Sequence, residues 1–128
     1  MTTNILQLPQ LSGSLNVTTN ADLRVTLQFV AAGTNTPLDL TGIAFESEWR
    51  LASDNNQVGL RLTTANGLLI NGGANGSLSW LVPAAQLKQL ASGAYVSDLL
   101  AIADGATINL FQGAPMTVNV TGGVTCLV

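Results

Sequence analysis

The chain has 128 residues, of which 47% are hydrophobic and 9% charged, and its net charge is −3. This length suits one domain with a single core, but a soluble globular domain usually has about 25% charged residues. The four basic residues, Arg24, Arg50, Arg61 and Lys88, are scattered. Because nucleic acids and anionic membrane surfaces are bound through clustered Lys and Arg, we expect neither as a partner.

The shortage of ionic residues predicts that part of the surface is buried against other proteins. Charged groups are depleted at the centres of protein interfaces, because removing them from water costs free energy. The chain is instead rich in uncharged polar residues such as Thr and Asn, which form hydrogen bonds across an interface without that cost. We therefore expect a homo-oligomer or another symmetric assembly.

Residues 1–13 are expected to form an N-terminal arm. Its apolar residues Ile5, Leu6, Leu8 and Leu11 are not accompanied by clear turn signals. The segment has neither the basic region of a secretory signal nor the long apolar run of a membrane anchor. We expect the arm either to add to the domain's own sheet or to pack on a neighbouring subunit by strand addition.

Two strands with one apolar face are predicted over residues 22–29 and 43–51. Apolar residues alternate with polar ones in both segments, as they do in a half-buried strand. A loop broken by Pro37 separates the two strands. Shorter strands are predicted over residues 58–63, 68–70 and 76–82, punctuated by Asn-Gly pairs that suit tight turns.

Residues 83–90 form the only predicted helix, of two turns at most, because Pro83 suits a first helical turn and Gly93 ends the stretch. Strands are expected over residues 94–103, 107–111 and 116–121, with a turn at Asp104-Gly105. The result is an all-β prediction: a single antiparallel, immunoglobulin-like β-sandwich of eight or nine strands. We assign it to residues 14–125.

Residues 126–128 are expected to form a C-terminal tail. Leu127 and Val128 are the interface candidates at this end, as Ile5, Leu6, Leu8 and Leu11 are at the other. The only cysteine, Cys126, has apolar neighbours and cannot form an internal disulfide. We interpret it as a thiol that is buried or packs with the tail, rather than as a reactive site.

The sequence favours a protein that is not an enzyme and has no cofactor or metal. The chain has no histidine, which excludes His-based acid–base chemistry, Ser-His-Asp and Cys-His systems, and the usual zinc sites. Ser-Lys chemistry would need Lys88, which we expect to face water. Glu46 and Glu48 share a strand face at a spacing compatible with glycosidase carboxylates, but such a pattern is typical of a solvated face on which Arg50 can pair with Glu48.

A possible calcium loop and a possible sugar-binding platform are both better explained as structural features. Residues 54–57 offer oxygen ligands without the spacing of a calcium loop, and we expect a hairpin turn there. Trp49, Trp80 and Tyr95 could form a sugar-binding platform if two of them faced outward. Their phase in the alternation places both tryptophans inward, as core anchors. A carbohydrate-binding β-sandwich module therefore stays the alternative function.

The order of landmarks resembles a sandwich domain of tailed-bacteriophage structural proteins. The resemblance spans about residues 22–125 and rests on six features: residues 38–42 (LDLTG), Phe45 with Trp49-Arg50, residues 78–82 with the short helix, residues 93–99 (GAYVSDL), the Asp104-Gly105 turn, and Gly113 with residues 123–125. It implies an immunoglobulin-like fold that joins tail, baseplate or fibre parts. Tyr95 would then form a hydrogen bond like that of a tyrosine corner.

The resemblance and the composition predict the same class of function. We expect a non-catalytic virion component, acting as a tail, baseplate or connector adaptor or as a capsid decoration protein. Its partners would be other virion proteins, and it would be made in the bacterial host cytoplasm. Because the sequence carries no receptor-binding region after the sandwich, host recognition is not the expected role.

Overall fold

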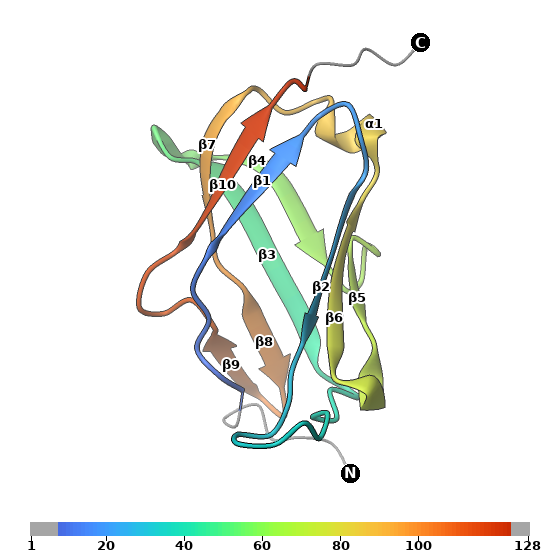
Figure 1. The fold of residues 1–128 in the computed structure, drawn as a ribbon. Helices are drawn as coiled ribbons and strands as arrows, with labels where there is room; N and C mark the ends of the chain where they lie inside the picture. The colour runs from blue at the N-terminus through green and yellow to red at the C-terminus, as the bar shows by residue number, and fades with distance from the viewer. Residues whose placement is uncertain (1–7, 124–128) are drawn as a thin grey trace.

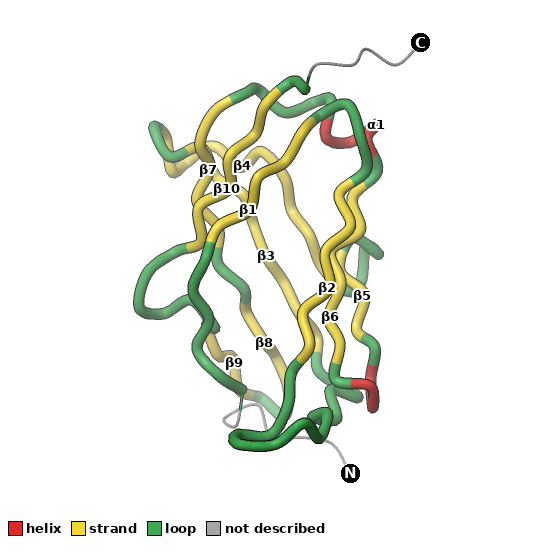
Figure 2. The backbone as a smooth tube through the Cα atoms, in the orientation of Figure 1, coloured by secondary structure: helices red, strands yellow, loops and turns green. Residues whose placement is uncertain are grey.

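The computed structural model describes residues 8–123, except for the side chains of residues 54–56, and consists mainly of strands (Figure 1, Figure 2). The described strands are β1 (Ser14–Thr18), β2 (Leu23–Gln28), β3 (Ala44–Leu51), β4 (Asp54–Thr63), β5 (Leu69–Asn71), β6 (Ser77–Val82), β7 (Gly93–Ser97), β8 (Leu100–Ala103), β9 (Ala106–Asn109) and β10 (Met116–Thr121). Among the described residues, only α1 (Ala84–Leu87) and the 3-10 helix η2 (Gly73–Asn75) are helical. The all-β prediction is confirmed, although the ten strands found in residues 8–123 exceed the eight or nine expected.

The strands form two sheets that are not joined into a closed barrel. The larger sheet has the order β1-β10-β7-β3-β8-β9, with β4 also paired to β3, and the smaller sheet has the order β2-β6-β5. All neighbours are antiparallel except β1 and β10. The expectation of a purely antiparallel arrangement is therefore wrong at β1. Parallel neighbours need a long crossover, and nearly the whole domain lies between these two strands.

Both sheets contribute to one hydrophobic core. Trp49 on β3 is 0% exposed and Trp80 on β6 is 2% exposed, so both predicted core anchors are confirmed. Burial alternates along β6, where Leu78, Trp80 and Val82 face inward, and along β10. The predicted alternation in the first two long strands is also present, with Phe29 and Phe45 buried.

The chain reverses two residues before the predicted turn at residues 54–57. Leu51 pairs with Asp54, which places Ala52 and Ser53 in the turn and the predicted turn residues in β4. The backbone N–H of Ala52 donates to the carbonyl oxygen of Ala94 at 3.0 Å, which fixes the reversal at this point.

The predicted strand over residues 94–103 is instead two strands, β7 and β8, separated at Asp98-Leu99. The hydroxyl of Ser47 donates to the carbonyl oxygen of Asp98 at 2.6 Å, and Ser47 is also hydrogen-bonded to Ser97 at 2.7 Å. A side chain thus takes the place of a ladder bond at the break. The two strands pair with different parts of β3, on either side of Ser47.

The helix is shorter than the predicted span of residues 83–90. It begins at Ala84, whose backbone N–H donates to a carboxylate oxygen of Asp22 at 2.8 Å. Its end tightens into a turn in which Leu90 N–H donates to Leu87 C=O. Leu87 and Leu90 are both buried, so the segment closes one end of the core.

Asparagine side chains hold the connections around the smaller sheet. Asn71 Nδ2 donates to the carbonyl oxygens of Leu40 and Ile43, each at 2.8 Å, and Asn71 Oδ1 accepts from Gly73 N–H at 2.8 Å. These bonds tie the LDLTG segment, which leads into β3, to the end of β5. The Asn71-Gly72 pair thus does more than permit a turn, because the amide group of Asn71 satisfies loop backbone atoms.

Tyr95 forms the expected hydrogen bond to an upstream loop. Its hydroxyl donates to the carbonyl oxygen of Ala91 at 2.7 Å, and the residue is 2% exposed. Burial raises the pKa of the phenol above its usual value of 10.0. We expect Tyr95→Phe to lower the free energy of unfolding by about 1 kcal/mol, the net value of one such bond. Urea denaturation checks this, and a variant as stable as the parent would contradict it.

Candidate functional site

An uncharged surface covers the outer side of β1, β10 and β7. The exposed residues of β10 alternate with buried Met116, Val118 and Val120, and the register sets Asn16 on β1 opposite Asn119 on β10. The amide of Asn119 donates to Asn16 Oδ1 at 3.2 Å. We call this surface the uncharged face and define it as Ser14, Asn16, Thr18, Ala94, Val96, Thr117, Asn119 and Thr121.

The uncharged face differs from an ordinary solvated sheet face. Edge strands commonly carry Lys or another charge that prevents pairing with other chains, whereas β1 is an edge strand and contains no charged residue. Hydroxyl and amide groups dominate the face, and such groups can be buried against a partner when they are hydrogen-bonded. The surface is therefore suited to contact with another protein.

The charged residues of the larger sheet gather instead on β3 and β4. Arg61 lies 3.5 Å from Glu46 and 4.0 Å from Glu48, while Arg50 lies 3.3 Å from Glu48. The predicted pairing of Arg50 with Glu48 is confirmed. With Asp98, these side chains account for five of the eleven charged residues of the chain. Their concentration leaves the rest of the sheet surface correspondingly poor in charge.

Asp98 is a member of this cluster that the sequence did not single out. Burial raises the pKa of its carboxyl above the usual 3.8, and the charge of Glu48 acts in the same direction. Asn109 Nδ2 donates to the carboxylate at 3.3 Å. A shallow pocket lined by Glu48, Arg50 and Asp98 lies above this carboxylate.

The raised pKa of Asp98 predicts how stability depends on pH. Because the folded protein disfavours the ionised form, this group lowers stability at pH values above its folded pKa, and the cost disappears as the pH falls to the unfolded value. Asp98→Asn should therefore gain stability relative to the parent at neutral pH, and the gain should shrink on acidification. Urea unfolding of Asp98→Asn and of the parent, at neutral pH and at an acidic pH, measures the difference in their free energies of unfolding. A gain that grows on acidification would contradict the prediction.

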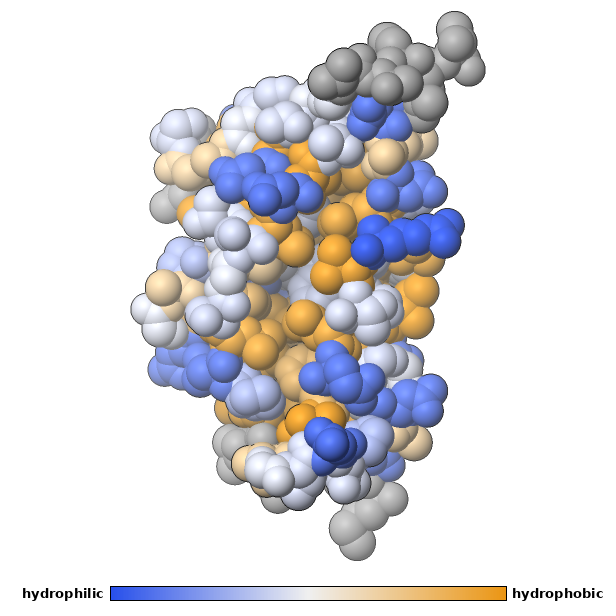
Figure 3. All heavy atoms as spheres, viewed as in Figure 1, coloured by the Kyte–Doolittle hydropathy of each residue, from blue (hydrophilic) through white to orange (hydrophobic). Residues whose placement is uncertain are grey.

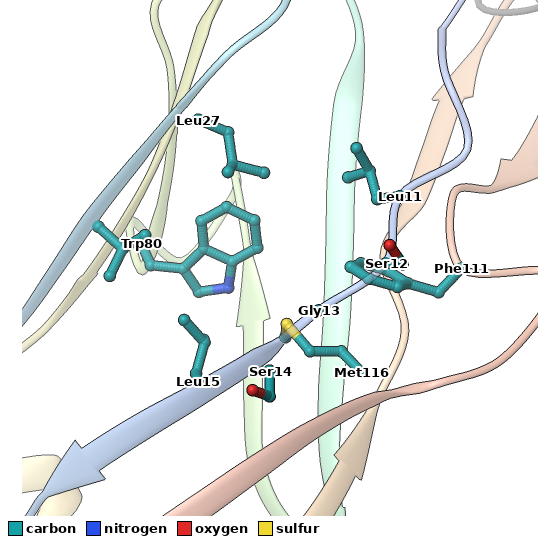
Figure 4. Close-up of a pocket in the computed structure, with 10 residues that line it drawn as sticks. Leu11, Ser12, Gly13, Ser14, Leu15, Leu27, Trp80, Phe111 and Met116 are labelled. Atoms are coloured by element: carbon teal, nitrogen blue, oxygen red, sulfur yellow. The ribbon is translucent and has the colours of Figure 1, made fainter.

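An apolar groove of about 120 Å³ lies between the edge strands of the two sheets. Leu15 of β1, Val25 and Leu27 of β2, Trp80 and Met116 line it (Figure 4). Hydrophobic residues are visible at the surface along the strip between these strands (Figure 3). The indole nitrogen of Trp80 faces Leu15 and Met116 across the groove (Figure 4) and has no hydrogen-bond partner among the described protein atoms.

The described part of the predicted arm packs on its own domain. Leu8 is 7% exposed and Leu11 is partly buried against the core. The backbone N–H of Leu11 donates to Leu110 C=O at 2.7 Å. Leu8 and Leu11 thus pack on their own domain, but residues 8–13 are not part of a strand, so these residues do not add to the sheet as one of the two predictions had it. The other interface candidates, Ile5, Leu6, Leu127 and Val128, lie outside the described residues.

The sequence did carry a signal for the uncharged face. Residues 14–18 (SLNVT) and 116–121 (MTVNVT) alternate strictly, and their polar positions hold only Ser, Thr and Asn. In most half-exposed strands some of these positions would be charged. Pairing of the two segments could not be read from this pattern, because it depends on the crossover between the sheets.

In the part of the chain that the structure describes, no group of three or more His, Cys, Asp or Glu residues could hold a metal ion. No described helix is long and apolar enough to span a membrane. No model of a known protein family matches the sequence, and no curated protein matches it.

Proposed function

We propose that the chain is a non-catalytic structural protein of a tailed-bacteriophage virion, assembling with other subunits as a tail, baseplate or connector adaptor or as a capsid decoration component. The observation that carries the proposal is the uncharged face. Exposed residues on three neighbouring strands lack any charge, in a chain with only 9% charged residues. Burial against neighbouring subunits is the use that suits such a surface.

The strand order supports an immunoglobulin-like β-sandwich as the fold type. That fold has a sheet containing strands B, E and D and a sheet containing C, F and G, with an added C′ strand in the variable type. Here β2, β6 and β5 correspond to the first sheet, and β3, β7 and β10 to the second, with β4 in the C′ position. This correspondence would match Trp49 with the buried tryptophan of strand C and Tyr95 with the tyrosine-corner residue of strand F, which supports the proposed fold type.

The segments that carry the resemblance to phage proteins have structural roles in this fold. In the LDLTG segment, an Asp39 carboxylate oxygen accepts from the backbone N–H of Thr41 at 3.0 Å and from its hydroxyl at 2.6 Å. The Asp104-Gly105 turn joins β8 to β9, as predicted. These roles support the family-level proposal only through the shape of the domain, because any sandwich could use such turns.

The alternative of a carbohydrate-binding module lacks the surface it needs. All six aromatic residues of the chain are among the buried core residues: Phe29, Phe45, Trp49, Trp80, Tyr95 and Phe111. Sugar binding by stacking requires a ring that faces outward, and no aromatic ring of this chain does so. The glycosidase alternative is equally unsupported, because Glu46 and Glu48 are engaged in ion pairs with Arg61 and Arg50.

The proposal is tested first by locating the protein. Particles of the virus that encodes the chain would be purified by density gradient and analysed by quantitative mass spectrometry. We expect the chain to be present in many copies per particle, in a fixed ratio to the capsid protein. Recovery of the chain only from the soluble fraction of the lysate would overturn the proposal.

A substitution on the uncharged face tests the mechanism. Asn119→Arg places an unpaired charge on that face, and we expect incorporation into particles to fall by at least about tenfold, since a buried unpaired charge costs several kcal/mol. Thr107→Arg, at an exposed position of β9, is the matched control. Equal incorporation of both variants would show that this face is not buried in the particle.

A further inference from the structure

Four of the five edge strands among the described residues carry a feature that discourages pairing with another chain. β5 has only three residues, and β2 carries the exposed cation Arg24. β4 carries Arg61, and its register with β3 shifts twice. The last carbonyl oxygen of β9, that of Asn109, accepts from Gln10 Nε2 at 3.0 Å. Short length, charge, irregular register and covering segments are the usual protections of a sheet edge.

β1 is the described edge strand that lacks all of these protections. Its five residues, Ser14–Thr18, include no charged residue and no proline, and its register with β10 runs without a shift. The strand lies at the border of the larger sheet (Figure 1), and the apolar groove leaves space beside its first two residues. An unprotected edge of this kind is a template for a strand of another chain.

The backbone of β1 has unused hydrogen-bonding groups along this edge. Thr19 N–H donates to Thr121 C=O at 2.9 Å, immediately after β1. Because successive residues of a strand direct their backbone groups to opposite sides, the odd-numbered residues of β1 face β10 and the even-numbered ones face away. The residues that face away are Ser14, Asn16 and Thr18. Their N–H and C=O groups have no partner in the part of the chain that the structure describes.

We infer that β1 pairs in the antiparallel direction with β1 of a second copy, about a two-fold axis at Asn16. In this register Asn16 lies opposite the partner's Asn16, Leu15 lies opposite the partner's Val17, and Ser14 lies opposite the partner's Thr18. This pairing rests on the proposed function, since it makes a second copy one of the neighbouring subunits. Because the other edges are protected, the assembly closes as a dimer rather than growing into a filament.

The backbone selects this register. In an antiparallel pair, opposite residues alternately exchange both N–H···O bonds or neither. With the axis at Asn16, the pairs that exchange bonds are formed by the three residues whose groups are unused. An axis at Leu15 or Val17 would leave one of those three without a partner inside the strand. A slip of one residue would oppose unused groups to groups already bonded to β10.

The inward side chains agree with the same register. Val17 is buried, whereas Leu15 faces the core but is only partly buried. Opposite residues of an antiparallel pair share a face, so the partner's Val17 would cover part of Leu15, and the reverse contact follows from the symmetry. Apolar residues thus meet apolar residues, and uncharged polar residues meet uncharged polar residues, along the whole strand.

The outward side chains extend a row of amides across the axis. Asn119 Nδ2 donates to Asn16 Oδ1 at 3.2 Å, and Asn16 Nδ2 has no partner among the described residues. Residues that exchange backbone bonds in this way have Cα atoms about 5.5 Å apart. Each Asn16 amide can therefore donate to the oxygen of the partner's Asn16. The uncharged face of one copy would then continue directly into that of the other.

Hydrogen exchange of the purified chain, resolved by residue with NMR, tests the pairing directly. Asn16 N–H faces away from β10, whereas Val17 N–H faces β10 in monomer and dimer alike. We expect Val17 N–H to exchange slowly at every concentration. Exchange of Asn16 N–H should slow by about tenfold where light scattering shows about nine tenths of the chain as dimer, since only the monomer exposes this group. An Asn16 rate that does not change with concentration would overturn the pairing.

Opposite charges at position 16 test the position of the axis. Asn16→Lys and Asn16→Asp each set like charges opposite one another, and we expect each variant alone to associate at least about tenfold more weakly than the parent. An equimolar mixture of the two should recover the lost association. Thr107→Lys and Thr107→Asp, at an exposed position of β9, are the matched controls and should associate like the parent, mixed or separate. Circular dichroism verifies that all four variants fold. A mixture of the Asn16 variants that associates no better than either alone would refute the axis.

The pairing and the proposed function fail in different experiments. An oligomer whose Asn16 N–H stays unprotected overturns the pairing and leaves the proposed function standing, because the uncharged face can be buried by other subunits. A protected Asn16 N–H in a chain that is absent from purified particles overturns the proposed function and leaves the pairing standing. A chain that is monomeric at every concentration overturns the pairing.

Discussion

Replacing Trp49 with alanine is expected to lower the free energy of unfolding by about 3–5 kcal/mol, the range found for large aromatic residues removed from cores. Trp49 is 0% exposed and lies where β3 pairs with both β4 and β7. The truncation would therefore leave a cavity beneath the centre of the larger sheet. A domain of this size is stable by about 5–15 kcal/mol in total, so the variant should unfold at a much lower urea concentration.

Two further variants identify the cause of that loss. Trp49→Phe keeps most of the ring volume and also removes an indole N–H that is buried without a partner, so its loss should be clearly smaller. Val58→Ala removes apolar atoms from a residue that is 42% exposed and should be close to neutral. If Trp49→Ala were no more destabilising than Val58→Ala, Trp49 would not be the core anchor described above.

Gly76→Ala is the second change expected to have a large effect, of about 3 kcal/mol or more, since a left-handed backbone costs a non-glycine residue about 1–3 kcal/mol and overpacking a similar amount. Gly76 has a φ of 71°, and a Cβ atom there would lie 2.6 Å from the carbonyl oxygen of Phe29 and 2.9 Å from that of Leu38. Both neighbours are backbone atoms in the segment before β3. They cannot move without disturbing the end of the smaller sheet.

Gly67→Ala is the matched control for this prediction. Gly67 also follows an asparagine and has a φ of 82°, but a Cβ atom there would meet nothing within 4 Å. The control should show only the conformational part of the loss, so the difference between the two variants in urea unfolding measures the steric part. Equal losses would mean that the close approach at Gly76 does not constrain the fold.

The long strands could be predicted from the sequence because their burial depends on local alternation. Residues 116–121 match β10, and Trp49 and Trp80 lie in the core as their phase required. The break at Asp98-Leu99 could not be predicted in this way, since it depends on the hydroxyl of Ser47, which is 51 residues away. The helix was overestimated at its C-terminal end, where Gln89 N–H donates to Gln86 C=O and Leu90 N–H to Leu87 C=O, so that the chain forms a turn instead of continuing the helix.

The positions of the candidate surfaces were harder to predict from the sequence than the strands were. Low overall charge indicated that a surface would be buried, but the location of that surface depends on which strands are neighbours. The uncharged face exists because β1 pairs in parallel with β10, so that Asn16 meets Asn119. The same pairing leaves β1 and β2 as facing edges and so creates the groove. The raised pKa of Asp98 arises from burial and from Glu48, neither of which is local in sequence.

The most direct test of the central claim is the mass of the purified chain in solution at low and high salt, measured by light scattering over a wide dilution series. If uncharged surfaces hold the subunits together, a defined oligomer should form as concentration rises. It should persist at about 1 M salt, where screening reduces the Debye length to about 3 Å. A chain that stays monomeric at every concentration, or an oligomer that dissociates in high salt, would contradict burial of the uncharged face between subunits.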